Sequence, residues 1–157
     1  LSRYSDATSV HLEQFPAVGD LWVDTDLEAT WDKLRQIRSV VTGALEIERA
    51  QKRIGSSLEA SAVIWIQNTS FMSVGNRHDL AEICITSGAT VEAGEPPPGA
   101  YTLPEVPGVA VVVSRAQGTK CARSWRITTD VGSDPDYPGL SARDAAAVRE
   151  IDGMRRA

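Results

Sequence analysis

Four polar side chains near the end of the chain are spaced like two pairs of metal ligands. Cys121 and Ser124 form a C-x-x-S pair, and Ser141 and Asp144 form an S-x-x-D pair. Zinc modules with two C-x-x-C pairs, about fifteen to twenty residues apart, have this spacing. Only Cys121 is a cysteine, so the chain has the spacing of a two-knuckle zinc module without its usual ligands.

The chemistry of these four positions argues against zinc. A serine hydroxyl stays protonated at neutral pH and is a poor ligand, whereas zinc sites use cysteine, histidine or carboxylates. Cys121 and Asp144 supply at most two usable ligands, too few for the roughly 10 kcal/mol that structural zinc contributes. We therefore expect no zinc. Packing, Asx turns within 132–139 and an arginine paired with Asp144 are expected to hold the loop.

A basic window free of acidic residues surrounds the first pair. No acidic residue lies between Glu105 and Asp130, and the window contains Trp125. Its basic residues are Arg115, Lys120, Arg123 and Arg126. Phosphates bind such cations and an unstacked base can lie on an indole face, so the window suits single-stranded RNA. In the alternative interpretation, Trp125 fills the space beneath a small ribbon and the arginines are solvated.

Composition and charge limit the class of protein. The 157 residues carry a net charge of −5, which argues against a freestanding, high-affinity nucleic-acid binder. Two cysteines make no disulfide framework, so a reducing cytosol is the expected location. No apolar run reaches about eighteen residues, and no membrane contact is expected. Since Leu1 is not a natural start, we expect a piece of a longer chain.

The sequence shows no catalytic constellation. It has no P-loop, no G-x-G-x-x-G and no H-E-x-x-H motif. His11 and His78 have no cysteine or aspartate arranged for nucleophilic catalysis, so solvated or structural roles are expected. We therefore predict no catalytic residue in this chain.

A long helix over 26–53 must carry the N-terminal part of the fold. Thr25 and Glu28 form a capping box, and Gly55 is placed to end the helix in a left-handed cap. Gly43 weakens the middle by about 1 kcal/mol. One apolar stripe contains Leu27, Trp31, Leu34, Ile37, Val41 and Leu45. The opposite face is either solvated or in contact with RNA phosphates, and contains Lys33, Arg35, Arg38, Arg49, Lys52 and Arg53.

Strands are predicted between this helix and the basic window. Alternation over 58–66 predicts a strand with Ala60, Ala62, Ile64 and Ile66 on one face. The β-branched run over 109–115 is typical of a buried strand. A further strand is expected over 82–91, interrupted at Ser87–Gly88. Residues 68–80 are expected to form a loop and a short helix, 95–107 a proline-rich connection, and 142–154 a terminal helix capped by Ser141.

The basic window, together with the C-x-x-S and S-x-x-D pairs, resembles the C-terminal zinc-binding module of bacterial isoleucyl-tRNA synthetases. In that family the segment reads C-x-R-C-W, then an aromatic/Thr/acidic/Val-Gly tail, then C-x-R-C. The matching residues are Cys121, Arg123, Trp125, Asp130, Val131, Gly132 and Arg143. Ser124, Ser141 and Asp144 stand where the family has cysteine. The segments 9–16, 54–60, 85–91 and 114–121 also match, in the family's order.

The resemblance implies an α+β fold in three parts. Residues 1–55 would form the last helix of an anticodon-binding bundle with its leading segment. Residues 56–118 would form a small α/β domain with a few strands. Residues 119–157 would form a metal-free, zinc-ribbon-like module with a short terminal helix.

The resemblance also implies a function. The chain would be a non-catalytic, anticodon-binding C-terminal portion of a class I isoleucine–tRNA ligase, which is cytoplasmic and monomeric. ATP and magnesium would belong to the parent enzyme, because the HIGH and KMSKS signatures are absent here. The partner would be isoleucine tRNA, and the alternative is a structural or protein-interaction module that has lost both zinc and RNA binding. The implied RNA-binding residues are Arg123, Trp125, Lys120, Arg126, Arg115, Lys52 and Arg53.

Overall fold

The structure is a computed structural model that describes residues 11, 14–15, 19 and 22–156. The leading segment, including the match over 9–16, lies largely outside these residues. Within the described part the fold is mixed α+β, with one long helix, two small sheets and a terminal helix, as predicted. No helix there is both long and apolar enough to span a membrane.

The long helix α1 spans Thr25–Ala50, and both of its ends differ from the prediction. It begins after Asp24, whose carboxylate accepts the Leu27 amide at 2.9 Å, so Asp24 rather than Thr25 is the N-cap. At the other end the backbone of Lys52 adopts a left-handed conformation, with φ of 58°. The amides of Lys52 and Arg53 donate to Arg49 and Glu48, the pattern of a Schellman motif. The helix therefore ends before Gly55, which was predicted to terminate it.

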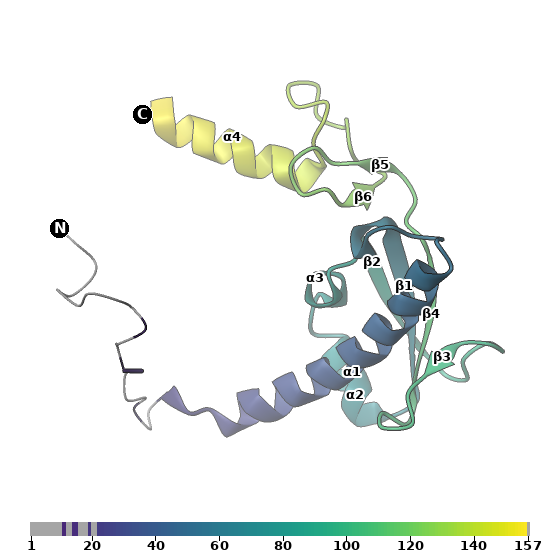
Figure 1. Cartoon of the computed structure of the whole chain (residues 1–157). Coiled ribbons are helices and arrows are strands. Elements are labelled where there is room, and N and C mark those ends of the chain that lie inside the picture. Colours follow the sequence, from purple (N-terminus) through teal and green to yellow (C-terminus); the bar gives the residue numbers. More distant parts are fainter. Residues whose placement is uncertain (1–10, 12–13, 16–18, 20–21, 157) are drawn as a thin grey trace.

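The apolar stripe of α1 is buried along only part of its length. Leu34, Ile37, Val41 and Leu45 are buried as predicted. Leu27 and Trp31 are 52% and 41% exposed, because the first turns of α1 extend past the sheet (Figure 1).

The main sheet has the order β2-β1-β4-β3. Its central strands are β1 (Ala60–Ile66) and β4 (Val109–Arg115), which pair antiparallel. At the edges, β2 (Gly88–Ala93) is parallel to β1, and β3 (Tyr101–Thr102) is antiparallel to β4. The predicted inward residues Ala60, Ala62, Ile64 and Ile66 are all buried, and they join α1 in one core.

Two short helices complete the core and overturn part of the strand prediction. They are α2 (Thr69–Gly75) and α3 (Leu80–Cys84). The Asp79 carboxylate caps α3 by accepting two backbone amides, so the start of the predicted 82–91 strand is helical. The strand begins only at Gly88, after Ile85 turns left-handed. Similarly, Ser57–Glu59 is a 3₁₀ turn rather than strand, and the predicted connection over 95–107 contains β3.

Gly43 has a packing role that its helix propensity does not indicate. A Cβ at this position would lie 2.4 Å from the Tyr101 hydroxyl and 2.7 Å from ring carbons of Tyr101. The missing side chain therefore lets the edge strand β3 pack directly against α1.

The C-terminal module consists of a hairpin and the terminal helix. Its elements are β5 (Thr119–Lys120), β6 (Ile127–Thr128) and α4 (Ala142–Arg156). The Ser141 carbonyl accepts the Ala145 amide, and its hydroxyl accepts the Asp144 amide at 3.3 Å, so Ser141 caps α4 as predicted. In Figure 1, α1 and α4 extend from the sheet toward the same side.

Candidate nucleic-acid interface

The four positions with zinc-ligand spacing come together around one carboxylate oxygen. The Ser124 and Ser141 hydroxyls donate to Asp144 Oδ2 at 2.6 and 2.9 Å. The Cys121 thiol donates to the same oxygen at 3.1 Å. The Ser141 amide donates to Cys121 Sγ at 3.4 Å and closes the cluster. We refer to these four residues as the Asp144 cluster.

Electrostatics favour the ionised form of Asp144. The hydroxyl of Ser124, followed by the Cys121 and Ser141 side chains and the charge of Arg123, holds the pKa of Asp144 below its usual range despite partial burial. Arg123 Nε lies 3.8 Å from Asp144 Oδ1, which confirms the predicted arginine pair. The Asp136 amide donates to Asp134 Oδ1 at 3.0 Å, so an Asx turn lies within 132–139 as predicted.

The Asp144 cluster does not fit a zinc ion. Its two usable ligands, Cys121 and Asp144, are hydrogen-bonded to each other. Across the part of the chain that the structure describes, no group of three or more His, Cys, Asp or Glu side chains could hold a metal ion. The expectation of a zinc-free module stays a prediction for metal analysis.

Trp125 follows Ser124 of the Asp144 cluster in the sequence, and its side chain lies on the surface. Its side chain is 60% exposed, so the alternative in which it fills the space beneath the ribbon is wrong. Its φ of 63° lies in the left-handed region, which costs about 1–3 kcal/mol for a residue other than glycine. Its amide donates to the Cys121 carbonyl at 3.0 Å, and this turn fixes the indole outside the module.

One basic residue lies against the exposed indole. Lys120 Nζ is 5.3 Å from the centroid of the Trp125 ring, a cation–π distance. Arg123, also near Trp125 in the same turn, is half-exposed beside Asp144. The structure therefore places an aromatic face and two cations on one turn of the hairpin module.

The other predicted RNA-binding residues lie in different settings. Arg126 is half-buried, and its Nη2 donates to the Ser87 carbonyl at 3.1 Å. Arg115 is largely exposed at the end of β4, 3.7 Å from Glu59. At the end of α1, Lys52 is exposed, whereas both Arg53 hydrogen bonds to Glu48 measure 2.5 Å. Arg126 and Arg53 are thus engaged within the protein.

Ser87 is a structural residue whose role the sequence did not indicate. Its hydroxyl donates to the Leu58 carbonyl at 2.5 Å and accepts the Ile127 amide at 2.7 Å. Together with the Arg126 bond to its carbonyl, these contacts join the main sheet to the hairpin. The only sequence signal was a small polar pair, Ser87–Gly88, that interrupts an apolar run.

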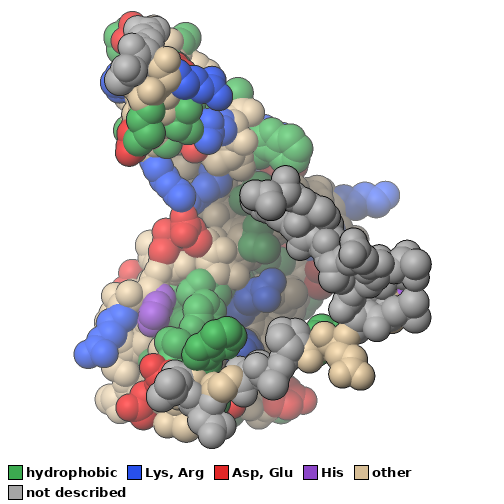
Figure 2. All heavy atoms as spheres, turned by 90° about the vertical axis from the view of Figure 1, so that its left-hand side faces the viewer, with side chains coloured by type: hydrophobic (Ala, Val, Ile, Leu, Met, Phe, Trp, Pro, Cys, Tyr) green, Lys and Arg blue, Asp and Glu red, His purple; other side chains and the backbone are tan. Residues whose placement is uncertain are grey.

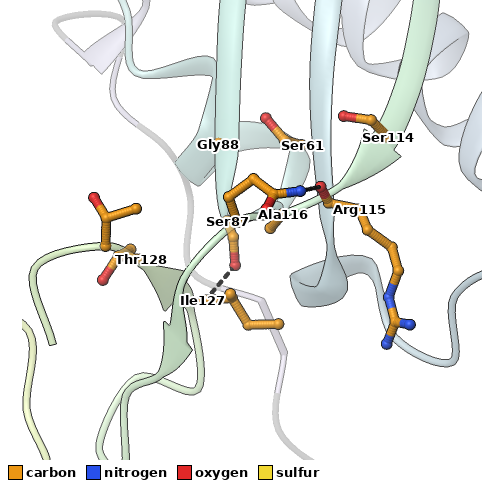
Figure 3. A pocket seen from close by; sticks show the side chains of 10 residues that line it. Ser61, Ser87, Gly88, Ser114, Arg115, Ala116, Ile127 and Thr128 are labelled. Carbon is orange, nitrogen blue, oxygen red and sulfur yellow. Dashed lines mark hydrogen bonds between the residues drawn. The ribbon is translucent and has the colours of Figure 1, made fainter.

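A pocket of about 480 Å³ lies at this junction (Figure 3). Ser61, Gly88 and Ser114 form its sheet side, and Ile127, Thr128 and Thr129 form its hairpin side. The remaining lining residues are Ser87, Arg115, Ala116 and Gln117. The lining carries no acidic side chain.

Charge is interspersed over the face seen in Figure 2. That view, from the left-hand side of Figure 1, shows basic, acidic and apolar side chains close together rather than one basic surface. The acid-free window over 106–129 belongs to a chain whose net charge is −5.

Comparison with known proteins gives a consistent set of relatives. No protein-family model matches the chain. It is 56% identical over 155 residues to the isoleucine–tRNA ligase of Agrobacterium fabrum, covering 99% of this chain and 16% of that protein. Identity is 57% over 151 residues with that of Bartonella henselae, and 51% over 159 residues with that of Mesorhizobium japonicum, covering 96% and 99% of the chain. The chain spans 16% of the length of each of these relatives.

Proposed function

Since the chain belongs to the isoleucine–tRNA ligase family and corresponds to 16% of the length of each relative, we propose that it is a tRNA-binding portion of such an enzyme. The proposed role is to contact the anticodon, with no catalytic step performed by this chain. Activation of isoleucine with ATP and magnesium belongs to the remainder of the enzyme. The proposed partner is the isoleucine tRNA.

The placement of Trp125 carries this proposal. An indole that is 60% exposed and held by a left-handed backbone contributes little to the core, but it offers a flat face to an unstacked base. Base–aromatic stacking of this kind is worth about 1–3 kcal/mol per base. Lys120 lies over the ring, and Arg123 lies two residues before Trp125 in the same turn, paired with Asp144. Both are the proposed contacts for the flanking phosphates.

The remaining basic residues have lesser roles in the proposal. Arg115 is exposed enough to reach a phosphate, as is Lys52 at the end of α1. Arg126 and Arg53 contribute charge while their guanidinium groups hold Ser87 and Glu48. Arg126 ranks lower because it is half-buried, and Arg53 because it makes two hydrogen bonds to Glu48.

We propose the same three-part organisation that the resemblance implies. Residues 1–55 end the anticodon-binding bundle, and the exposed side chains of Trp22, Leu27 and Trp31 are where the rest of that bundle would pack. Residues 56–118 form the small α/β domain. Residues 119–157 correspond to a zinc ribbon in which the Asp144 cluster stands where the family has a metal.

The decisive experiment uses the full-length enzyme that contains this chain. Arg123→Ala and Trp125→Ala should each raise the KM for tRNA, by about 5- to 100-fold for the tryptophan because stacking is lost. Isoleucine-dependent pyrophosphate exchange should stay unchanged, because that step needs no tRNA contact. A thermal melt of each variant controls for folding, and Met154→Ala, which removes another exposed apolar side chain of the C-terminal module, is the control substitution.

The opposite outcome favours the alternative function. If folded enzymes with either substitution, and the enzyme lacking residues 106–129, charge tRNA normally, the anticodon role is wrong. The chain would then be a structural or protein-interaction module that has lost both zinc and RNA binding.

A further inference from the structure

The pocket between the main sheet and the hairpin is hollow because one row of the sheet has small side chains. Ser61 of β1 pairs with Gly88 of β2 and Ser114 of β4, so the three residues cross the sheet in register. A Cβ at Gly88 would lie 2.8 Å from the Ser61 hydroxyl oxygen. The next row on the same face of the sheet has larger side chains, those of Thr90, Val63 and Val112. The glycine thus keeps the Ser61 hydroxyl accessible.

Hydrogen-bonding groups in the pocket are available to a ligand. Within the described part of the chain, the hydroxyls of Ser61 and Ser114 make no hydrogen bond. In Figure 3 these two side chains lie side by side, opposite Ile127 and Thr128 of the hairpin. Each serine hydroxyl can donate one hydrogen bond and accept two.

One cation lies at the rim of the pocket. Arg115 is the one charged residue of the lining, and 70% of its side chain is exposed. Its contact with Glu59 is 3.7 Å long, which leaves most of its five donors for another partner. Arg115 follows Ser114 in β4, so its side chain leaves the opposite face of the sheet and reaches the rim of the pocket, away from the two hydroxyls (Figure 3). Hydroxyls with one guanidinium at their rim suit a ribose and the phosphate attached to it.

The pocket and the indole belong to one hairpin. Ile127, which lines the pocket, pairs with Lys120, whose ammonium group lies over the Trp125 ring. The volume of about 480 Å³ falls within the range of about 300–1,000 Å³ that small-molecule sites occupy. An RNA strand whose base covers Trp125 therefore has a site for its backbone on the same hairpin.

We propose that this pocket is a subsite for one phosphate–ribose unit of a single-stranded RNA, whose neighbouring base stacks on Trp125. The inference rests on the RNA-binding function proposed above and adds a second contact to it. The hydroxyls of Ser61 and Ser114 bind the ribose and Arg115 binds the phosphate. Because the 2′-hydroxyl distinguishes the two nucleic acids, the pocket favours RNA over DNA of the same sequence.

The test uses the full 157-residue chain and three probes: a mixed-sequence heptaribonucleotide, the same sequence in DNA, and inorganic phosphate. Amide chemical shifts and affinities are measured for each. The RNA should shift the amides of Ser61, Ser114 and Thr128 together with the Trp125 indole signal. Ser114→Val and Arg115→Gln should each weaken RNA binding by about 3- to 10-fold, as loss of one or two hydrogen bonds does. Ser114→Val should also reduce the preference for RNA over DNA.

Matched substitutions identify which proposal fails. Thr90→Val, on the same sheet but outside the pocket, and Arg77→Gln, an exposed arginine after α2, should leave affinity unchanged. If Trp125→Ala weakens RNA binding while Ser114→Val and Arg115→Gln do not, the pocket assignment is overturned and the proposed function stands. If the unmodified chain binds no RNA, the pocket assignment is overturned, and the KM for tRNA of the full-length variants decides the proposed function.

Two further outcomes complete the test. Inorganic phosphate that shifts the pocket amides when RNA does not would indicate a site for free anions and overturn the RNA assignment. If Ser114→Val lowers the melting temperature, the shifts of the unmodified chain and the affinity of the surface variant Arg115→Gln decide the question.

Discussion

At the scale of single residues, Asp144 organises the C-terminal module. One carboxylate oxygen accepts three side-chain donors that come from both ends of a loop of more than a dozen residues. Hydrogen bonds to a charged group are worth about 1.5–3 kcal/mol each, and removing a buried partner leaves the others unsatisfied. The module therefore depends on the charge of one side chain.

The stability of the module should fall in acid. Because the folded-state pKa of Asp144 is depressed, its contribution is present above the unfolded pKa of about 4 and is lost as pH falls through the folded value. We expect Trp125 fluorescence to report loosening of the turn between neutral pH and about pH 3. Asp144→Asn should destabilise the module at neutral pH and remove much of this pH dependence. Asp32→Asn, exposed on α1, is the control, and identical pH profiles for both variants would contradict the role of Asp144.

The arrangement of the Asp144 cluster also predicts how a metal site could be built. The protein as it stands should contain no stoichiometric zinc on metal analysis. Ser124→Cys, Ser141→Cys and Asp144→Cys together add three thiolates to Cys121 around one point, and this variant should take up about one zinc per chain. Ser133→Cys, Ser73→Cys and Asp32→Cys provide a control with the same number of thiols at scattered sites. Equal zinc uptake by the two variants would show that the four positions do not converge.

At the scale of elements, the hairpin β5–β6 depends on Gly118. Its φ of +117° is unfavourable for any other residue, and a Cβ there would lie 2.3 Å from the Thr128 carbonyl oxygen. Gly94 has a similar φ of +109° with no atom within 4 Å of the Cβ position. Comparing alanine substitutions at the two glycines therefore separates the cost of a left-handed backbone from the cost of the steric contact.

Gly118→Ala and Gly94→Ala should therefore differ in stability. Both pay the backbone cost of about 1–2 kcal/mol, but only the substitution at 118 displaces the paired strand. Urea unfolding should show a clearly larger loss for Gly118→Ala, together with loss of the Lys120–Trp125 contact. Equal losses would mean that the hairpin adjusts freely around the added methyl group.

The sequence predicted those elements whose pattern is local. The run at 109–115 is so rich in β-branched residues that β4 matches its predicted bounds. The bounds of α1 were wrong at both ends, because whether Asp24 or Thr25 caps a helix depends on local geometry that composition does not specify. Residues 82–84 were predicted as strand but are helical, since a short apolar run has no distinctive period. The two-residue β3 exists only through its pairing with β4.

The candidate site was predictable to a similar degree. The C-x-x-S and S-x-x-D spacing indicated that the four residues of the Asp144 cluster lie together. The absence of acidic residues over 106–129 pointed to Trp125 and its basic neighbours. The joint at Ser87 could not be predicted, because its partners Leu58 and Ile127 lie 29 and 40 positions away. The same is true of the pocket, which requires the register of three strands.

At the scale of the whole molecule, Ser87 determines how the C-terminal module sits on the main sheet. Its hydroxyl is buried and bonded on both sides, and Arg126 and the Arg143–Glu82 ion pair reinforce the joint. Exposed ion pairs contribute little, typically about 0–1 kcal/mol, so the serine should dominate.

Ser87→Ala should uncouple the two parts. It leaves the Ile127 amide without its acceptor, at a cost of about 1–3 kcal/mol. Hydrogen exchange should then increase at the hairpin while the core strands β1 and β4 stay protected. Arg143→Gln is the control for the surface ion pair and should have a small effect. Equal protection of the hairpin in Ser87→Ala and the unmodified protein would contradict this role.

The Asp144 cluster has a consequence for how the protein is made in the cell. A metal-centred module must capture an ion after synthesis, so its folding follows the supply of that ion. A carboxylate is delivered with the polypeptide itself, in a fixed ratio of one to one. Folding of this module would then be insensitive to metal starvation and to chelating agents. With a carboxylate in place of a metal ion, we expect acid rather than metal scarcity to be the condition under which the module loosens.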